Sequence, residues 1–341
     1  GVWSWTTPMP SGVYTYSFFR NCPNPMPSVS GCVAISDPGS PPWNTSGAIE
    51  PTSQVYVPSD PAFGTIDYSW QAANPVKGAL VDVTYPSPQS TNPPGSHYLA
   101  VYTPPGYDPN RALPYPTLYL SHGAGGNEVD WSTQGVAGNI IDNLLASGRV
   151  QPMVVVMTNF NGISGGNTGY ATDVIQNVIP YVEANYRVSN LPADRAFAGL
   201  SAGGARANTL LFNYTTTFGA YSAMSNAGGV PTASSALWQN PDLRTRLGIH
   251  IGCGYQDFIW SSTLNEMNLL TANNIPFVSD LMHGGHAWYV WRILLRDFAD
   301  TMAFKHTTTT VTREGSGDRG LYDFTIAVKA STTEPAVPSG T

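Results

Sequence analysis

Charged side chains are scarce in this sequence of 341 residues, where Asp, Glu, Lys and Arg together make up only 11%. The formal net charge is -7, and no run of like charges occurs. Binding to nucleic acid or to an anionic membrane surface requires a patch of basic side chains. The composition therefore predicts neither partner.

The sequence also lacks a long hydrophobic run. No apolar stretch approaches the roughly 20 residues that a helix needs to cross a bilayer, and the first residues do not resemble a signal peptide. We expect a chain without a membrane segment, from which any targeting segment has been removed. Glycine, proline, tyrosine and tryptophan are abundant, a loop-rich and aromatic-rich mixture that favours a secreted, extracellular protein acting on polysaccharide.

Cysteine is rare, with three in the chain. Cys22 and Cys32 lie in a stretch rich in Pro, Ser and Asn, and we expect them to close a short disulfide loop outside the cytoplasm. The alternative is two unpaired surface thiols. Cys253 lies in the apolar run "LGIHIGCGY", which predicts a buried free thiol.

The pattern of apolar residues divides the chain into three segments. Residues 1–66 contain short alternating segments separated by turn-forming residues, which predicts a small all-β module, part of which is absent or supplied from elsewhere. Over residues 67–306, continuous apolar runs alternate with helical patterns, which predicts an α/β domain whose mostly parallel sheet has helices on both faces. Residues 307–341 read as a polar Thr/Gly linker and then one strand-like segment, "LYDFTIAVKA". That segment either pairs with the first module or starts a further β domain.

Ser201 stands out in "RAFAGLSAGGARANTLLF", between an apolar run and a helix-forming segment. A nucleophilic serine on a tight strand-to-helix turn needs small residues two positions before and after it, here Gly199 and Gly203. The same G-x-S-x-G form recurs around Ser164, but there the following residues are typical of a loop. Ser201 is therefore the predicted nucleophile, and a helix N-cap is the alternative interpretation.

A serine hydroxyl needs a neutral imidazole to take its proton. In "MHGGHAWYVW", His286 is favoured over His283 because two glycines precede it and a helix begins after it. His250 lies inside a predicted strand and is expected to be a core residue. The two histidines of the "MHGGHAW" loop lack a third ligand at matching spacing, so neither a metal nor another cofactor is predicted.

The imidazole in turn needs an acceptor, which in this chain order falls between the serine and the histidine. Asp257 comes just after the end of a predicted strand, where open α/β sheets place their ligands. It is favoured over Asp242 in a polar segment, Glu266 on a predicted helix and Asp280 inside a strand.

Two backbone N–H groups are predicted to form an oxyanion hole. One belongs to Ala202, directly after the serine, and the other to Ala124 in "TLYLSHGAGGNEVDW", where a strand runs into a glycine-rich loop. An ordinary strand-exit turn is the alternative for this loop, and His122 is expected to be a structural hydrogen-bonding residue. Aromatic residues near these loops are expected to line an acyl pocket or, equally, to serve packing: Trp131, Tyr255, Trp260 and Trp288.

Five motifs together resemble a known family. "VYTPPGYDPNRALPYPTLYLSHGAGGNEVDW", "NVIPYVEANYRV", "FAGLSAGGARA", "GCGYQD" and "GGHAWYVWR" are similar to the esterase D-like α/β-hydrolases of carbohydrate esterase family 1, which include feruloyl and acetylxylan esterases. The resemblance covers about residues 67 to 305. It implies an α/β-hydrolase fold and the same nucleophile, acid and base as the residue-level reasoning. The segment "GVWSWTTPMPSGVYTYSF" resembles part of a β-sandwich akin to family 48 carbohydrate-binding modules, and the tail resembles the start of a bacterial immunoglobulin-like repeat.

The expected function is that of a serine esterase, a carboxylic ester hydrolase that forms an acyl-enzyme on Ser201. The resemblance implies that it releases feruloyl or related hydroxycinnamoyl groups from plant cell-wall polysaccharide such as arabinoxylan. The alternatives are an acetylxylan or other short-acyl esterase, an acyltransferase to sugars, and a non-catalytic carbohydrate-binding protein. The sequence makes no prediction of the oligomeric state.

Overall fold

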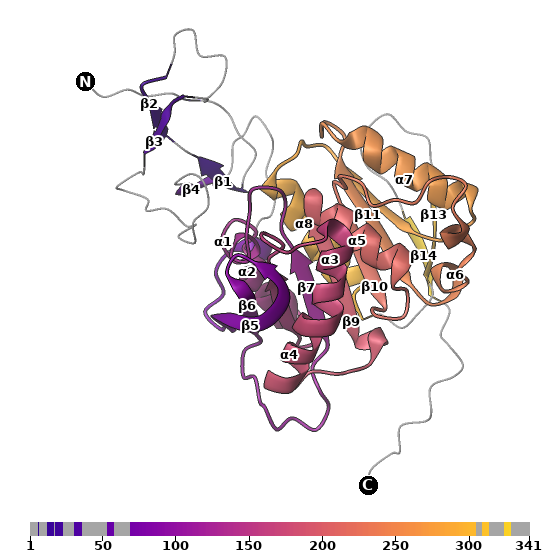
Figure 1. Ribbon diagram of the computed structural model, residues 1–341, viewed down its shortest axis with the longest axis horizontal. Helices are drawn as coiled ribbons and strands as arrows, with labels where there is room; N and C mark the ends of the chain where they lie inside the picture. The colour runs from indigo at the N-terminus through magenta and orange to yellow at the C-terminus, as the bar shows by residue number, and fades with distance from the viewer. Residues whose placement is uncertain are drawn as a thin grey trace.

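The computed structural model describes residue 6 and residues 12–16, 18–22, 31–35, 53–57, 69–304, 309–313 and 324–328. Its centre is one eight-stranded sheet in the order β12-β11-β10-β9-β7-β8-β6-β5 (Figure 1). The strands are β5 (Ala79–Thr91), β6 (Pro94–Thr103), β7 (Thr117–Ser121), β8 (Val154–Thr158), β9 (Arg195–Leu200), β10 (Ala220–Met224), β11 (Gly248–Gly254) and β12 (Val278–Met282). From β8 to β12 all neighbours are parallel, while β5 and β6 form an antiparallel hairpin at one edge.

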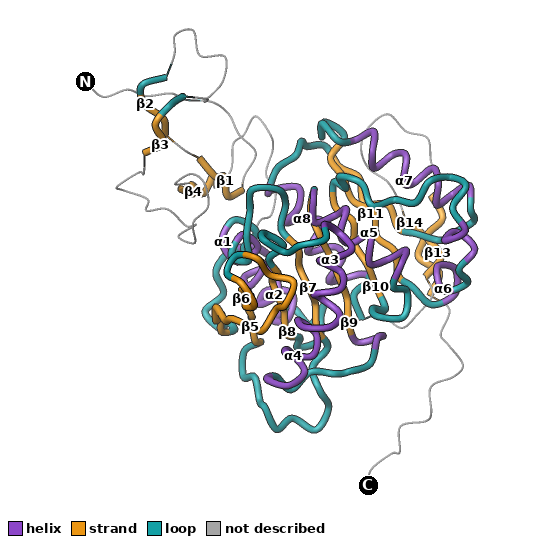
Figure 2. The backbone as a smooth tube through the Cα atoms, viewed as in Figure 1, coloured by secondary structure: helices purple, strands orange, loops and turns teal. Residues whose placement is uncertain are grey.

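Helices cover both faces of this sheet (Figure 2). They are α1 (Asp130–Thr133), α2 (Ala137–Ala146), α3 (Gly166–Asp173), α4 (Ile179–Asn185), α5 (Ala202–Asn213), α6 (Asp242–Thr245), α7 (Trp260–Ala272) and α8 (Trp288–Thr301). Short 3-10 turns at Ser69–Gln71, Pro192–Asp194 and Ala236–Gln239 and a π-helical turn at Val174–Val178 complete the described helical segments. The predicted α/β architecture is therefore confirmed.

Two hydrophobic cores lie on opposite faces of the sheet. Tyr119 of β7 packs in the core covered by α3, α4, α5 and α7, whereas its neighbours Leu118 and Leu120 pack in the core covered by α1, α2 and α8. The strands β7 to β10 are buried along their whole length because both faces are covered. This explains why their sequences are continuous apolar runs without polar alternation.

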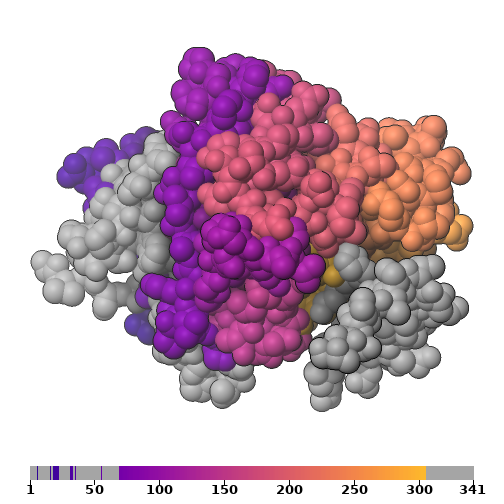
Figure 3. Space-filling view, turned by 90° about the horizontal axis from the view of Figure 1, so that it is seen from below, coloured from indigo at the N-terminus to yellow at the C-terminus, as the bar shows by residue number. Residues whose placement is uncertain are grey.

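The order of the strands creates a switch point beside β7. The chain passes from β7 to β8 on one side and then crosses to β9 on the other side of β7. From β9 to β12 each new strand is added outward, so the colours of Figure 3 run in chain order across the body. In such sheets the loops at the carboxyl ends of the strands diverge at the switch point and leave room for a ligand. A ligand site is therefore expected at the loops after β7 and β9.

Several short strands lie outside this sheet. In the N-terminal part β1 (Gly12–Tyr16) pairs with β4 (Ser53–Val57), and β2 (Phe18–Arg20) with β3 (Val33–Ile35). A disulfide joins Cys22 and Cys32 as predicted, and Cys253 is a buried free thiol. The remaining residues of segment 1–66 lie outside the described part, so its likeness to a carbohydrate-binding module stays a prediction, as do the three segment boundaries.

The tail differs from the expectation of a polar linker. Residues Thr309–Arg313 form a strand, β13, that pairs antiparallel with β14 (Phe324–Val328). The polar composition of this Thr-rich stretch predicts a linker, but threonine and valine are β-branched and favour extended backbone. The strand-like tail segment therefore pairs within the tail. That it starts a further β domain stays a prediction. Across the described segments, no helix combines the length and apolar composition that crossing a membrane requires.

Candidate active site

Ser201 lies at a strained turn between β9 and α5. Its backbone has φ 54° and ψ -115°, a conformation that costs an L-residue about 1–3 kcal/mol. Three hydrogen bonds hold the turn: the Ser201 N–H donates to the Met224 carbonyl at 2.9 Å, and the Ser201 carbonyl accepts from Ala205 at 3.2 Å and Ala227 at 3.1 Å. The predicted strand, tight turn and helix are thus all present.

The two glycines of the motif permit close backbone contacts around this turn. A Cβ atom on Gly199 would overlap with the carbonyl oxygen of Gly203. A Cβ atom on Gly203 would lie 2.6 Å from the carbonyl oxygen of Ser121 and 2.5 Å from that of His122. The strand, the helix and the loop after β7 therefore meet at the serine at distances that only glycine allows.

The two serines of the G-x-S-x-G motifs differ in their hydrogen bonding. Ser201 occupies the N-cap position of α5, but its side chain makes no capping hydrogen bond. Its hydroxyl is therefore not used to start the helix. Ser164 of the second motif lies in a turn before α3, where its hydroxyl donates to the Gln89 carbonyl at 3.1 Å. It is a loop residue, as predicted.

His286 and Asp257 form a hydrogen-bonded pair. The Nδ1 atom of His286 lies 2.9 Å from each carboxylate oxygen of Asp257. The Asp257 side chain is fully buried, and one of its oxygens also accepts from the Ile259 N–H at 2.9 Å. A carboxylate held in this way keeps the proton on Nδ1 and leaves Nε2 available as a base.

Backbone contacts hold the two loops that carry this pair. Asp257 follows β11 and His286 follows β12, which are parallel neighbours. The Gln256 N–H donates to the Gly284 carbonyl at 2.9 Å, and the Gly284 N–H donates to the Gln256 side chain at 2.6 Å. The Trp291 ring lies 4.8 Å from that of His286 at 90°, and its indole N–H donates to the Ser225 hydroxyl at 3.0 Å. The imidazole is thus positioned by α8 as well as by Asp257.

The loop after β7 runs past the serine. A Cβ atom on Gly123 would lie 3.4 Å from the Ser201 Cβ, so the residues leading to Ala124 are adjacent to the turn. Ala202 begins α5, and the first N–H groups of a helix have no partner within it and carry a partial positive charge. Ala202 is thus the first residue of α5, Ala124 follows a glycine adjacent to Ser201, and the role of both in an oxyanion hole stays a prediction.

His122 at the start of this loop is structural. It is buried, its Nδ1 lies 2.6 Å from the Gly123 carbonyl, and its Nε2 accepts from the Phe160 N–H at 3.3 Å. Its ring also stacks on that of Phe160 with centroids 3.8 Å apart. Burial lowers the pKa of His122 to about 4, so it stays uncharged at neutral pH.

A second histidine–aspartate contact lies inside the sheet. His250 of β11 is 1% exposed, with Nδ1 2.8 Å from the Ser222 hydroxyl and Nε2 3.3 Å from the Asp280 carboxylate. This confirms the prediction that His250 is a core residue. It also gives Asp280 a partner other than His286.

The other rival acids are likewise engaged elsewhere. Glu266 is fully buried on α7 and accepts from the side-chain amides of Asn226 and, at 3.1 Å, Asn208. Burial raises the pKa of Glu266 to about 8. Asp242 accepts from the Thr215 hydroxyl at 2.9 Å. Asp257 is thus the acid that the structure places beside His286.

A comparison with models of protein families assigns the chain to a family. The family model described as "Putative esterase" matches residues 90–299, which is more than half of the sequence. The chain belongs to this esterase family. It is accordingly a carboxylic ester hydrolase, and the esterase-like identity predicted from the five motifs is confirmed.

Relatives of the esterase include proteins that are much longer than this chain. It is 31% identical over 268 residues to an endo-1,4-beta-xylanase/feruloyl esterase from Xylanibacter ruminicola, an alignment that covers 74% of this chain and 33% of the relative. It is 36% identical over 141 residues to endo-1,4-beta-xylanase Y from Acetivibrio thermocellus, covering 38% of this chain and 12% of that protein. The chain therefore spans a third or less of the length of these two relatives.

Solved structures share the fold of the esterase. The feruloyl esterase module from Clostridium thermocellum, complexed with sinapinate, has a TM-score of 0.61 at 23% identity and covers 70% of this chain and 92% of its own. A CE1 ferulic acid esterase from Anaeromyces mucronatus, in complex with ferulic acid, has a TM-score of 0.61 at 18% identity, covering 70% and 96%. These similarities bear out the predicted α/β-hydrolase fold.

The aromatic residues predicted near the site of the esterase differ in exposure. Trp131 is 1% exposed, donates to the Ser121 carbonyl at 3.0 Å and packs edge-on against Trp288 at 5.2 Å, which favours the packing interpretation. Trp288 is partly buried, as are Tyr255 and Trp260, whose ring centroids lie 5.3 Å apart. Their proposed part in substrate binding stays a prediction.

The sequence reasoning missed Phe258. Its side chain is 76% exposed, and its ring centroid lies 4.4 Å from that of His286. The signal available in the sequence was its place directly after Asp257, the predicted acid. Among the described residues, no three His, Cys, Asp or Glu side chains are grouped as a metal site requires.

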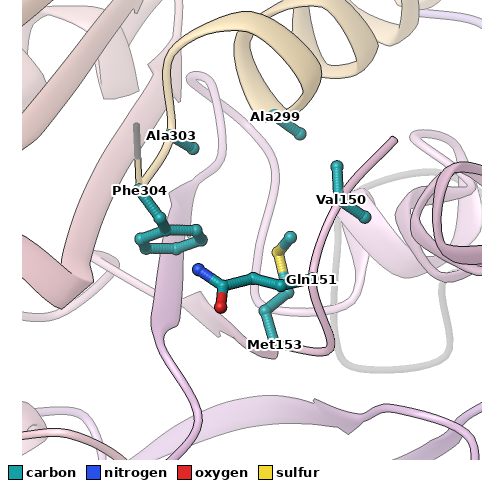
Figure 4. A pocket seen from close by; sticks show the side chains of 6 residues that line it. All are labelled: Val150, Gln151, Met153, Ala299, Ala303 and Phe304. Carbon is teal, nitrogen blue, oxygen red and sulfur yellow. The ribbon is translucent and has the colours of Figure 1, made fainter. Parts of the chain in front are cut away.

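A separate pocket lies away from these residues. Figure 4 shows its lining side chains, which come from the segment before β8 and from the end of α8: Val150, Gln151, Met153, Ala299, Ala303 and Phe304. The segment before β8 leads into the amino end of that strand, and the strands β7, β8 and β9 are parallel. The pocket therefore lies at the amino ends of the parallel strands, whereas Ser201 lies at their carboxyl ends.

Proposed function

We propose that the chain is a secreted serine esterase that hydrolyses feruloyl or related hydroxycinnamoyl esters of plant cell-wall polysaccharide through an acyl-enzyme on Ser201. The observation that carries the proposal is the His286–Asp257 pair, held at 2.9 Å on loops at the same sheet edge as the strained Ser201 turn. The name of the Xylanibacter ruminicola relative, a xylanase/feruloyl esterase, supports the choice of acyl group. The Cys22–Cys32 disulfide supports an oxidising, extracellular location.

In the acylation step, the Ser201 Oγ attacks the ester carbonyl carbon while Nε2 of His286 accepts the hydroxyl proton. Asp257 stabilises the imidazolium that forms. The tetrahedral intermediate then collapses: the bond from carbon to the sugar oxygen breaks, and Nε2 returns the proton to that oxygen. The sugar leaves as a free alcohol, and the feruloyl group stays on Ser201 as an ester.

The second step uses water in the place of the sugar. Nε2 takes a proton from water, the resulting hydroxide adds to the acyl carbon, and the bond to Ser201 Oγ breaks as the serine regains its proton. In both steps the negative charge on the carbonyl oxygen is stabilised by the N–H groups of Ala202 and Ala124. Loss of one such donor costs about 3–4 kcal/mol of barrier.

Initial rates on methyl ferulate, acetylated xylan and a long-chain p-nitrophenyl ester test the proposal. We expect methyl ferulate to have the highest kcat/KM, and Ser201→Ala to lose at least a thousandfold in kcat. Ser164→Ala is the matched control, since its serine has the same motif but lies in a loop, and it should keep the wild-type rate. A Ser201→Ala variant with a tenth of wild-type activity would falsify the mechanism. Faster cleavage of acetylated xylan would instead identify an acetylxylan esterase.

A further inference from the structure

We propose that Phe258 is the platform on which the sugar half of the substrate binds, so that it sets the preference for carbohydrate esters over simple alkyl esters. The inference rests on the proposed function and deepens it. It concerns the leaving alcohol, whereas the predicted aromatic residues were assigned to the acyl group.

The loop between β11 and α7 fixes the orientation of Phe258. The Asp257 N–H donates to the Gly254 carbonyl at 3.1 Å, the Trp260 N–H donates to the Asp257 carbonyl at 3.0 Å, and the Asp257 carboxylate accepts from the Ile259 N–H at 2.9 Å. This turn directs Asp257 inward, at 4% exposure, and Phe258 outward, at 76% exposure. The aromatic ring is therefore presented to solvent by a hydrogen-bonded turn.

In the described part of the chain, the aromatic rings of Phe258 and Trp291 contact His286, and they differ in exposure. Trp291 meets the imidazole edge-on and is 6% exposed, because it packs in the core beneath α8. Phe258 meets it with a tilt of 50° and a centroid distance of 4.4 Å. A large exposed apolar side chain that touches a site residue is a surface that a ligand can cover.

The chemistry of acylation determines which half of the ester lies beside Phe258. His286 returns a proton to the leaving oxygen, which must come within about 3 Å of Nε2. The alcohol half of the ester therefore lies against the imidazole, within reach of a ring that contacts it. The carbonyl oxygen lies toward Ala202 and the loop after β7, and the acyl group extends from the carbonyl carbon away from the leaving oxygen.

A sugar ring suits such a surface. Its C–H groups carry partial positive charge and pack on the negative face of an aromatic ring, while its hydroxyl groups need polar partners at the rim. Gln256 and His283, both exposed, provide such groups on the same two loops, and their side-chain nitrogens lie 3.3 Å apart. The alcohol half of methyl ferulate is only a methyl group, which has no ring to stack on Phe258. Its binding therefore gains nothing from this platform.

The rival role for Phe258 is to shield the Asp257–His286 pair from water. A shield would act on the imidazole itself, so its removal would lower the rate on every ester by the same factor and move the pH dependence of kcat. A platform acts only on substrates that carry a sugar. The ratio of kcat/KM for a sugar ester to kcat/KM for a methyl ester distinguishes the two roles.

The test measures kcat/KM for feruloyl-arabinose and for methyl ferulate with wild type, Phe258→Ala and Phe258→Tyr. We expect Phe258→Ala to lower kcat/KM for feruloyl-arabinose, mainly through KM, by a factor about ten times larger than the factor by which it lowers kcat/KM for methyl ferulate. Phe258→Tyr keeps the aromatic face and should keep the wild-type ratio. Leu264→Ala, which removes another exposed apolar side chain (41% exposed) from the neighbouring helix, is the control and should change neither substrate.

If Phe258→Ala lowered kcat/KM by the same factor on both feruloyl esters, or shifted the pH profile of kcat, the proposal that Phe258 is a platform would be wrong. If wild type cleaves acetyl but not feruloyl esters, the proposed acyl group is wrong and the platform is tested by the same ratio on acetylated xylo-oligosaccharide and p-nitrophenyl acetate. If it cleaves no ester, both proposals fail. Thermal melting of each variant confirms that it is folded.

Discussion

Two histidines in the described part of this esterase contact an aspartate, and they lie in different surroundings. His286 contacts Asp257 through Nδ1, on loops beyond the ends of β11 and β12, and its side chain is 17% exposed. His250 contacts Asp280 through Nε2 from within β11, its Nδ1 faces Ser222, and its side chain is 1% exposed. Serine, histidine and aspartate are present in both groups, so residue types alone do not make a catalytic site.

The difference lies in what the backbone does at the serine. Ser222 lies inside β10, fully buried between β9 and β11, where no ester can approach its hydroxyl. Ser201 follows the last residue of β9 at a turn with φ 54°, which directs the chain from the strand into the helix. The strained turn at a strand end therefore distinguishes Ser201, a candidate nucleophile, from Ser222, whose hydroxyl is structural.

The largest effect is expected for Asp257→Asn. The amide cannot hold His286 in the tautomer that leaves Nε2 as a base, so kcat on methyl ferulate should fall about 10⁴-fold. The thermal melting temperature should change little, because the residue keeps its shape. Initial rates and melting curves of the purified variant check both parts, and a loss below tenfold would show that Asp257 does not orient the base.

A smaller effect, on stability rather than activity, is expected for Glu266→Gln. Glu266 keeps its proton in the folded protein up to a pKa of about 8 but loses it near pH 4.5 when unfolded. The stability of wild type should therefore fall, through this group, as the pH rises from about 4.5 to about 8. The glutamine variant lacks this dependence, so its advantage in free energy of unfolding should grow over that range and stay constant above pH 8.

Urea unfolding of Glu266→Gln and wild type at several pH values measures this difference. Activity at each pH should agree within twofold between the two proteins, since Glu266 is not placed beside His286. A difference in stability that is independent of pH would show that the carboxyl is ionised in the folded state. Glu266 would then not be a neutral buried acid.

The smallest effect is expected for Asp280→Asn, the interior counterpart of the first substitution. The contact with His250 is long, at 3.3 Å, and the Asp280 side chain is 21% exposed. Its loss should lower the free energy of unfolding by about 1 kcal/mol and leave kcat within twofold of wild type. Urea unfolding and initial rates check this, and a hundredfold loss of kcat would mean that the interior group takes part in catalysis.

Much of this architecture was predictable from the sequence because its signals are local. The apolar run before Ser201, the two glycines and the helix-forming residues after it specify the turn within residues 195–212. The place of Asp257 at the end of a predicted strand indicates the acid, and the glycines before His286 and the helix after it indicate the base. These features depend on neighbouring residues, and the structure brings Asp257 and His286 together as expected.

The features that were missed depend on tertiary contacts. Nothing in the composition around Phe258 says that its side chain points outward while that of Asp257 points inward. Trp131 lies close to the site in sequence, yet the α1 turn buries it beneath Trp288. The strand at Thr309–Arg313 forms through pairing with residues more than ten positions later, a partner that a polar local composition does not reveal.

The most direct test of the account is to locate the acyl group on the enzyme. Wild-type protein is mixed with excess methyl ferulate, quenched in acid within the first turnovers, digested with protease and analysed by mass spectrometry. The account predicts a feruloyl group on the peptide that contains Ser201, and none on the peptides that contain Ser222 or Ser164. A feruloyl group on either of those serines, or an acylated Ser201→Ala protein, would contradict it.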